Sequence, residues 1–118
     1  MITDGASEED PVLTNPDHCT IFENDLVRVL DYRDHPGDST TPHVHPNSVM
    51  VTLTEFQRRL STGAGDREVD LPAHQVLWLP AQRHSGENIG ETETHTILIE
   101  LKGVAAGIVD GTVIGPAT

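Results

Sequence analysis

The sequence predicts an all-β domain, and three observations indicate this fold class. Short runs rich in Val, Leu, Ile and Tyr alternate with turns that contain Gly, Pro and Asp. No stretch of the sequence carries apolar residues at the 3.6-residue period of an amphipathic helix. The length, 118 residues, fits one domain with a single core.

The expected strands follow one another at short intervals along the chain. Residues 26–33 are rich in Val, Leu and Tyr, which favour strands, and the turn formers of residues 35–38 end this run. Residues 61–66 form a plain turn of small and polar residues. Many short strands of this kind are typical of a sandwich or a closed barrel. In chain order, we expect strands at residues 20–22, 26–33, 48–53, 56–60, 68–71, 76–79 and 94–101.

The two ends of the chain differ in composition from its middle. Residues 1–18 are polar and acidic at their start, and we expect a flexible or strand-forming arm there. Residues 19–102 form the expected barrel. Residues 103–118 mix Gly and Ala with Val and Ile, which fits either a flexible tail or an extra strand on the barrel or on a partner subunit.

The charge of the chain limits its partners. Nineteen acidic residues against seven basic ones give a net charge of -12, which repels phosphate backbones and anionic lipids. We therefore expect neither nucleic acid nor a membrane as a partner. Cys19 is the sole cysteine, so an intrachain disulfide is impossible, and the acidic N-terminus does not resemble a secretory signal. These features predict a cytoplasmic protein.

A pair of histidines is the first sign of a metal site. His43 and His45 are two residues apart, so on an extended strand both imidazoles point to the same face. Imidazole is a common nitrogen ligand for Zn, Fe, Mn, Ni and Cu. Pro42 and Pro46 restrict the backbone on either side. Such a pair arises easily by chance, so its weight comes from the residues around it.

The pair belongs to a longer pattern of residues. Gly37 precedes His43 by five intervening residues, and residues 71–80 lead on to His84 and Asn88. This arrangement resembles the two signature motifs of the cupin superfamily, and it covers roughly residues 22–102. The run PAQRHSGENIG is similar to a segment typical of small single-domain cupins. The resemblance implies a double-stranded β-helix, which is a jelly-roll barrel and often dimeric, with metal ligands at His43, His45 and His84.

The sequence departs from the cupin pattern at several positions. Val49 and Met50 stand where the family's carboxylate ligand is expected, and Glu55 falls in an expected turn, too far along the strand to replace it. His74 and Gln82 stand where glycines are usual. The simplest interpretation is a three-histidine site, similar to that of cysteine dioxygenase-like cupins, for a divalent transition metal such as Fe, Mn, Ni or Zn.

The walls of the site follow from strand parity. Val49, Val51 and Leu53 have the same parity as His45, so they line the cavity if that parity continues through Pro46. Such apolar walls suit a small, partly apolar organic ligand that carries one metal-binding group.

Other polar residues are candidates for a supporting role. His95 would act as an acid, a base or a support for a ligand if its face of the strand is the barrel interior. Arg28 and Tyr32 share a face of their strand and could orient a substrate carboxylate or donate a hydrogen bond. For both residues, an outward and solvated side chain is the alternative. His18 and His35 are interpreted as loop residues.

These residues support two classes of function. The first is a metal-dependent cupin enzyme acting on a small molecule, with oxygenase-type chemistry on iron or isomerase, cyclase or lyase chemistry on Mn, Ni or Zn. The alternative is a module that binds a sugar or metabolite without turning it over, or a degenerate cupin without metal. We also expect a homodimer, because open sheet edges are costly.

Overall fold

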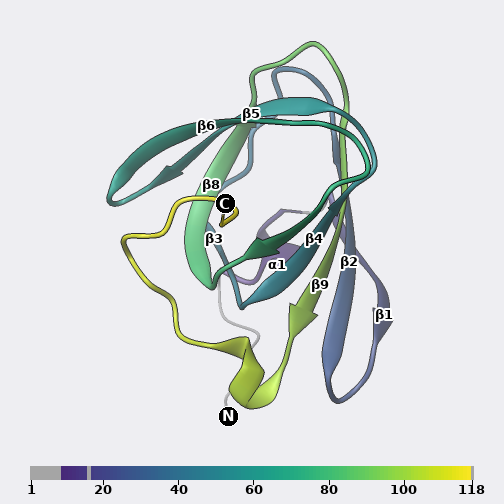
Figure 1. Cartoon of the computed structure of the whole chain (residues 1–118), viewed down its shortest axis with the longest axis vertical. Coiled ribbons are helices and arrows are strands. Elements are labelled where there is room, and N and C mark those ends of the chain that lie inside the picture. The colour runs from purple at the N-terminus through teal and green to yellow at the C-terminus, as the bar shows by residue number, and fades with distance from the viewer. Residues whose placement is uncertain (1–8, 16, 118) are drawn as a thin grey trace.

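The computed structural model describes residues 9–15 and 17–117, which form two antiparallel sheets that face each other (Figure 1). The all-β prediction is therefore confirmed. The elements are α1 (Pro11–Thr14), β1 (His18–Glu23), β2 (Val27–Asp34), β3 (His43–His45), β4 (Ser48–Thr52), β5 (Phe56–Thr62), β6 (Gly65–Leu71), β7 (Val76–Leu79), β8 (Gln82–Asn88), β9 (Thr94–Leu101) and the 3-10 helix η1 (Gly103–Ala106).

Each sheet combines strands from distant parts of the chain. The five-stranded sheet has the order β1-β2-β9-β4-β7, and the four-stranded sheet has the order β3-β8-β5-β6. Strand β9 therefore lies between β2 and β4, and β8 lies between β3 and β5. These crossings between the sheets are the feature that distinguishes a jelly roll from a simple up-and-down barrel.

The inner faces of the sheets are unusually polar. Along β9 the buried residues are Thr94, Thr96, Leu98 and Glu100, which alternate with less buried neighbours as the two-residue period of a strand requires. The packed apolar cluster is small and consists of Leu30, Met50, Leu79 and Leu98, and the other buried apolar residues are Tyr32, Phe56, Leu60, Val69 and Ala81. A barrel with so few inward apolar side chains has an interior that serves as a site as well as a core.

Two strand predictions need correction. Strand β8 was not predicted, although it lies at the centre of the second motif. Val49 and Val51 were expected to face the cavity, but β4 buries Ser48, Met50 and Thr52 instead. The physical reason is that β3 and β4 belong to different sheets, so the turn between them resets the alternation that His45 had set.

The segment before β1 fixes the start of that strand. Asp10 caps α1 by accepting a hydrogen bond from the backbone N–H of Val12. Asn15 then accepts a hydrogen bond from the Thr41 N–H through its side-chain oxygen, at 2.8 Å. This contact holds His18, which follows closely in the chain, beside β3. Of the expected arm at residues 1–18, residues 1–8 and 16 lie outside the described residues, and the described part contains α1 and the first residue of β1.

The segment after β9 packs on the barrel without forming a strand. It runs from η1 back toward β8 (Figure 1), and the backbone N–H of Ala117 donates a hydrogen bond to the carbonyl oxygen of Trp78 on β7. Arg67 donates hydrogen bonds to the carbonyl oxygens of Ile114 and Pro116, and Gly115 pairs with the side chain of Gln82. Gly115 and Pro116 are buried. This segment therefore closes one side of the barrel.

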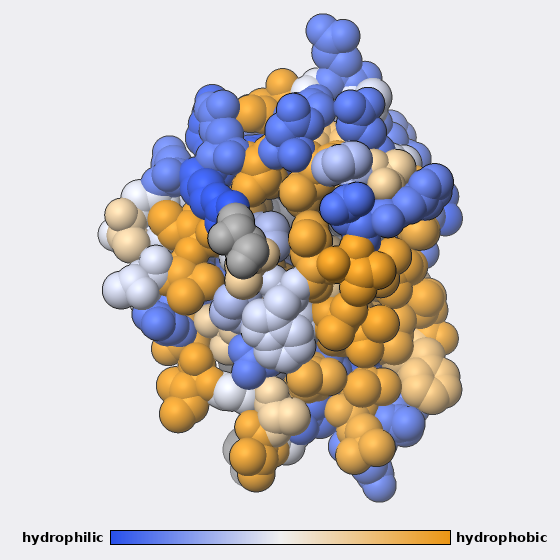
Figure 2. All heavy atoms as spheres, in the orientation of Figure 1, coloured by the Kyte–Doolittle hydropathy of each residue, from blue (hydrophilic) through white to orange (hydrophobic). Residues whose placement is uncertain are grey.

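The surface on this side mixes apolar and charged side chains. Figure 2 shows apolar side chains over much of this face and hydrophilic side chains along its upper rim. Exposed large apolar residues include Val76, Trp78, Val104 and Ile108. In the part of the chain that the structure describes, no helix has the length and apolar character needed to cross a bilayer.

Candidate metal centre

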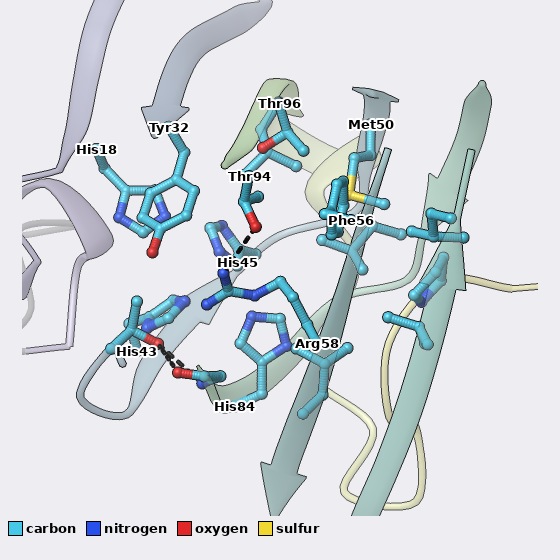
Figure 3. Close-up of a pocket in the computed structure, with 18 residues that line it drawn as sticks. His18, Tyr32, His43, His45, Met50, Phe56, Arg58, His84, Thr94 and Thr96 are labelled. Carbon is cyan, nitrogen blue, oxygen red and sulfur yellow. Dashed lines mark hydrogen bonds between the residues drawn. The ribbon is translucent and has the colours of Figure 1, made fainter. Parts of the chain in front are cut away.

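The three histidines that the motifs single out lie together in the barrel. His43 and His45 project inward from β3, and His84 faces His43 from the neighbouring strand β8 (Figure 3). The ring centroids are 4.8 Å apart for His43 and His45, 4.8 Å for His43 and His84, and 5.3 Å for His45 and His84. All three residues are buried. Segments separated by about forty residues thus meet at one place.

A fourth histidine joins them from the first strand. His18, expected in a loop, is the first residue of β1, where it pairs with Tyr32 on β2. Its ring lies 5.2 Å from that of His43 and 5.6 Å from that of His45. One ligand atom from each of His18, His43 and His45 lies within 4.8 Å of the others. Among the described residues, this buried three-histidine cluster is the group able to hold a metal ion. It contains His18, which sequence reasoning missed, and it does not contain His84, the expected third ligand.

Hydrogen bonds fix the orientation of all four rings. In each ring, Nδ1 lies near an oxygen that accepts a hydrogen bond, so Nδ1 carries the proton and Nε2 keeps its lone pair. The acceptors are the Asn15 carbonyl for His18 (3.3 Å), the Thr41 carbonyl for His43 (2.7 Å), Glu100 Oε2 for His45 (2.8 Å) and Gln82 Oε1 for His84 (2.7 Å). The side-chain amide of Asn15 also lies 3.2 Å from Nδ1 of His43, but the shorter carbonyl contact decides the tautomer.

The four rings share a common cavity, and each leaves one nitrogen free. Among the described residues, the Nε2 atoms of these four histidines have no hydrogen-bond partner. Every fully buried polar side-chain atom in the described part of the chain does have a partner, so each of these Nε2 atoms keeps some accessible surface. All four histidines line the same cavity. Its volume is about 70 Å³. One water molecule needs roughly 10–15 Å³ of such space. The cavity thus has room for an ion and a ligand of a few atoms.

Burial keeps these histidines neutral. It lowers the pKa of His18 to about 2, with smaller contributions from the nearby His45 and His43. Burial also lowers the pKa of His43, and it holds the pKa values of His45 and His84 well below the usual range. Since the neutral imidazole is the form that binds metals, the cluster is ready to act as a ligand set near pH 7.

A buried carboxylate supports His45 from behind. Glu100 on β9 accepts the Nδ1 hydrogen bond of His45, and burial raises the pKa of this carboxyl. Arg28 binds the same carboxylate at 2.8 Å through Nη2 and 2.9 Å through Nε, and its Nη1 lies 3.1 Å from Asp10. Carboxylate–histidine pairs of this kind orient metal ligands and raise their basicity.

The other predicted site residues lie at different places. Tyr32 lines the cavity, and its hydroxyl donates a hydrogen bond to Asp34. Arg28 lies beyond Glu100 and lines a separate, wider groove of about 650 Å³. His95 lies on the outer face of β9, because the interior face is that of Thr94 and Thr96, and its Nε2 is 3.1 Å from Asp31.

The cavity also shows what stands in the place of the family's carboxylate. Met50 lines the cavity, so a thioether occupies the position where the motif leads one to expect an oxygen ligand. Glu55 is exposed and is not part of the cavity lining. The available ligands are therefore imidazoles, a donor set that suits Fe, Mn, Ni, Zn or Cu and not the oxygen-seeking Mg or Ca.

Comparison with known proteins supports the fold. No family model matches the sequence, and no curated protein matches it. A cupin domain from Bordetella pertussis Tohama I is 27% identical, over 73% of this chain and 92% of that chain, with a TM-score of 0.68. An uncharacterized conserved protein with a double-stranded β-helix domain from Klebsiella pneumoniae is 20% identical, over 82% of each chain, with a TM-score of 0.59.

A third solved structure agrees with these two. A Cupin 2 conserved barrel domain protein from Salinispora arenicola is 17% identical, over 75% of this chain and 77% of that chain, with a TM-score of 0.55. The structural neighbours are thus small cupin proteins, and this chain has their double-stranded β-helix fold. The resemblance seen in the sequence motifs is confirmed.

Proposed function

We propose that this cupin binds one divalent transition metal through its buried imidazoles and acts as an enzyme on a small organic molecule in the cavity. One observation carries the proposal: four buried histidines, each with Nδ1 beside an oxygen acceptor, line one cavity, and ligand atoms of His18, His43 and His45 lie within 4.8 Å of one another. Structural histidines on a barrel wall need no such grouping.

The proposed ligands are His43 and His45, joined by His84 from the second motif and by His18. Four imidazoles would saturate a tetrahedral zinc ion, but they leave two positions open on a six-coordinate ion. The ligand count therefore favours Fe, Mn or Ni if all four bind, and it allows zinc if three bind.

The metal would supply oxygen activation if it is iron, or Lewis-acid catalysis of isomerase, cyclase or lyase type. The chain's own residues provide the surroundings of that chemistry. Phe56, Leu79 and Leu98 line the cavity and keep bulk water away. Tyr32 presents a hydroxyl that Asp34 holds in place, and burial raises the pKa of this phenol, so the proton stays on the oxygen.

Metal analysis of protein purified without a histidine tag tests the proposal. We expect about one equivalent of transition metal in the wild type. The double variant His43→Ala/His45→Ala should lose it while keeping the circular dichroism spectrum of the wild type. His74→Ala, which removes an exposed histidine, is the matched control and should keep the metal.

The same experiment separates the alternative functions. Wild-type protein that takes up none of Fe, Mn, Ni or Zn after chelation and reloading would contradict the metal site. If that metal-free protein still binds small metabolites, it is a binding module. Oxygen consumption with candidate substrates then distinguishes oxygenase-type from non-redox chemistry.

We also propose that the protein is a homodimer that pairs through the open edges of the larger sheet. Its edge strand β1 carries Ile21 and Phe22, which are 56% and 54% exposed, and exposed apolar edges favour association. Sedimentation equilibrium at micromolar concentration should give twice the monomer mass. A monomer at all concentrations would overturn this proposal.

A further inference from the structure

Arg58 places a guanidinium group inside the barrel. It faces inward on β5 between Phe56 and Leu60, and its side chain is only 8% exposed. Nη1 donates hydrogen bonds to Asp34 Oδ2 at 2.6 Å and to Thr94 Oγ1 at 3.1 Å. Figure 3 shows this guanidinium among the rings of the histidine cluster. These contacts use one nitrogen and fix the plane of the group.

The opposite edge of the same guanidinium is open. In the described part of the chain, Nε and Nη2 of Arg58 have no hydrogen-bond partner. Since none of the described polar side-chain atoms is both fully buried and unpaired, these two nitrogens reach the cavity that Arg58 lines. The Nε–Nη2 edge offers two parallel N–H donors, which match the two oxygens of a carboxylate.

A glycine on the neighbouring strand lies close beside this edge. Gly86 lies on β8, on the same inward face as His84. A Cβ atom at Gly86 would lie 3.1 Å from Nη2 and 3.3 Å from Nε of Arg58, and 3.1 Å from a methyl group of Leu60. Any side chain at this position would crowd the open edge of the guanidinium.

With a divalent ion bound, the charges around the cavity favour an anionic ligand. Arg58 is balanced by Asp34, and Arg28 lies between Glu100 and Asp10, so these five groups together carry one negative charge. The histidines are neutral. A divalent ion would leave the site with one positive charge in a buried place, and a monoanionic ligand would neutralise it.

We propose that Arg58 binds the carboxylate group of a small organic acid through Nε and Nη2, with the rest of the acid directed toward the histidines. The acid would also contact the metal ion, and this part of the inference rests on the proposed function. A cavity of about 70 Å³ restricts the acid to a few heavy atoms, as in a 2-oxo or 2-hydroxy acid of about three carbons.

Nuclear magnetic resonance of the ¹⁵N-labelled full chain tests the carboxylate contact directly. The probes are pyruvate and its neutral amide, added to metal-free and zinc-loaded protein. The Nε–H signal of Arg58 is assigned by its loss in Arg58→Lys, which keeps a positive charge beside Asp34. Pyruvate should shift this signal in a saturable way, the amide should not, and the Nε–H signal of the exposed Arg59 should stay unchanged.

Two variants sharpen the result. Gly86→Ala keeps the guanidinium, the Asp34 pair and the histidines, yet it should weaken pyruvate binding at least about tenfold, because two charge-assisted hydrogen bonds are disturbed. Arg58→Lys should weaken binding similarly, and Arg59→Lys should not. Unchanged pyruvate affinity in Gly86→Ala, or pyruvate binding without a shift at Arg58, would overturn the inference.

The two proposals fail in different ways. If the protein binds metal but pyruvate does not shift the Arg58 signal, the carboxylate contact is contradicted and the proposed metal site is not affected. If the protein takes up no metal but pyruvate shifts the Arg58 Nε–H signal in a saturable way, the metal site is contradicted and the contact at Arg58 is supported.

Discussion

The histidines inside the barrel and those on its surface have different surroundings. Inside, every Nδ1 lies beside an oxygen acceptor, and all four rings line one cavity. On the surface, His35 is 75% exposed beside Asp38 and Glu93, and His95 contacts Asp31. The residue type is the same in both regions. A candidate metal ligand is distinguished by the oxygen acceptor at its Nδ1 atom together with its burial.

The largest expected effect that separates the two regions is on the pH dependence of stability. Because the interior histidines have lowered pKa values, the unfolded chain binds more protons than the folded protein below about pH 6.5. Stability should be full above the unfolded pKa of about 6.5 and should fall below it, by about 1.4 kcal/mol per histidine for each pH unit. For His18 the loss continues down to its folded pKa of about 2.

Urea unfolding of chelated protein between pH 7.5 and pH 5.5 measures this slope. His18→Gln should reduce the slope relative to that of the wild type. The raised pKa of Glu100 acts in the opposite direction in the acidic range, since it favours proton binding by the folded state. A stability that stays constant over this range would contradict the assignment of neutral buried rings.

The second prediction compares two aspartates on opposite faces of β2. Asp34→Asn leaves the buried charge of Arg58 without its carboxylate, which should cost about 3–5 kcal/mol in the free energy of unfolding. Asp31→Asn, three residues earlier on the outer face, should cost less than about 1 kcal/mol. Equal losses by denaturant titration would show that the inner pair is not isolated from water.

The third prediction concerns the carboxylate behind His45. Glu100→Gln keeps the shape of the side chain but weakens the acceptor of the Nδ1 proton, so metal affinity should fall about 10- to 100-fold. Competition of nickel between the protein and a chromophoric chelator gives this ratio. The exposed Glu87→Gln on β8 should leave the affinity unchanged. Equal affinities of the two variants would mean that Glu100 has no part in orienting the ligand.

The smallest effect is expected at the outer face of β9. His95→Gln should change the free energy of unfolding by less than about 1 kcal/mol, because the pair with Asp31 is partly exposed. Metal content should equal that of the wild type. Loss of metal in this variant would place His95 among the residues that support the site, against its position on the outer face.

Much of the fold was predictable because its strands follow ordinary rules. The expected run at residues 94–101 coincides with β9, and residues 76–79 with β7, since both are rich in apolar or β-branched residues. Strand β8 was missed because its inward positions are Gln82, His84, Gly86 and Asn88, which serve the site and remove the apolar alternation. A strand whose inward residues serve a site therefore lacks the apolar alternation by which strands are predicted from sequence.

The site residues that belong to the two cupin-like motifs were predictable from the sequence, and the others were not. His43, His45 and His84 belong to recognisable spacings, whereas His18 follows a proline-rich stretch and is brought in by pairing of β1 with β2. Arg58 carried a usable signal that was passed over. It has the parity of Phe56 and Leu60, so an inward Phe56 already implied an inward Arg58.

The segment that closes one side of the barrel has a kinetic consequence. Gly115 exchanges two hydrogen bonds with Gln82, and the same Gln82 accepts the Nδ1 hydrogen bond of His84, while Pro116 lines the cavity. A molecule that enters from this side must first detach the segment from the barrel. Detachment frees the side chain of Gln82, which then no longer fixes the ring of His84. For a ligand that uses this route, the residence time in the cavity should follow the opening rate of the segment, and ligand release should coincide with loss of the orientation of the His84 ring.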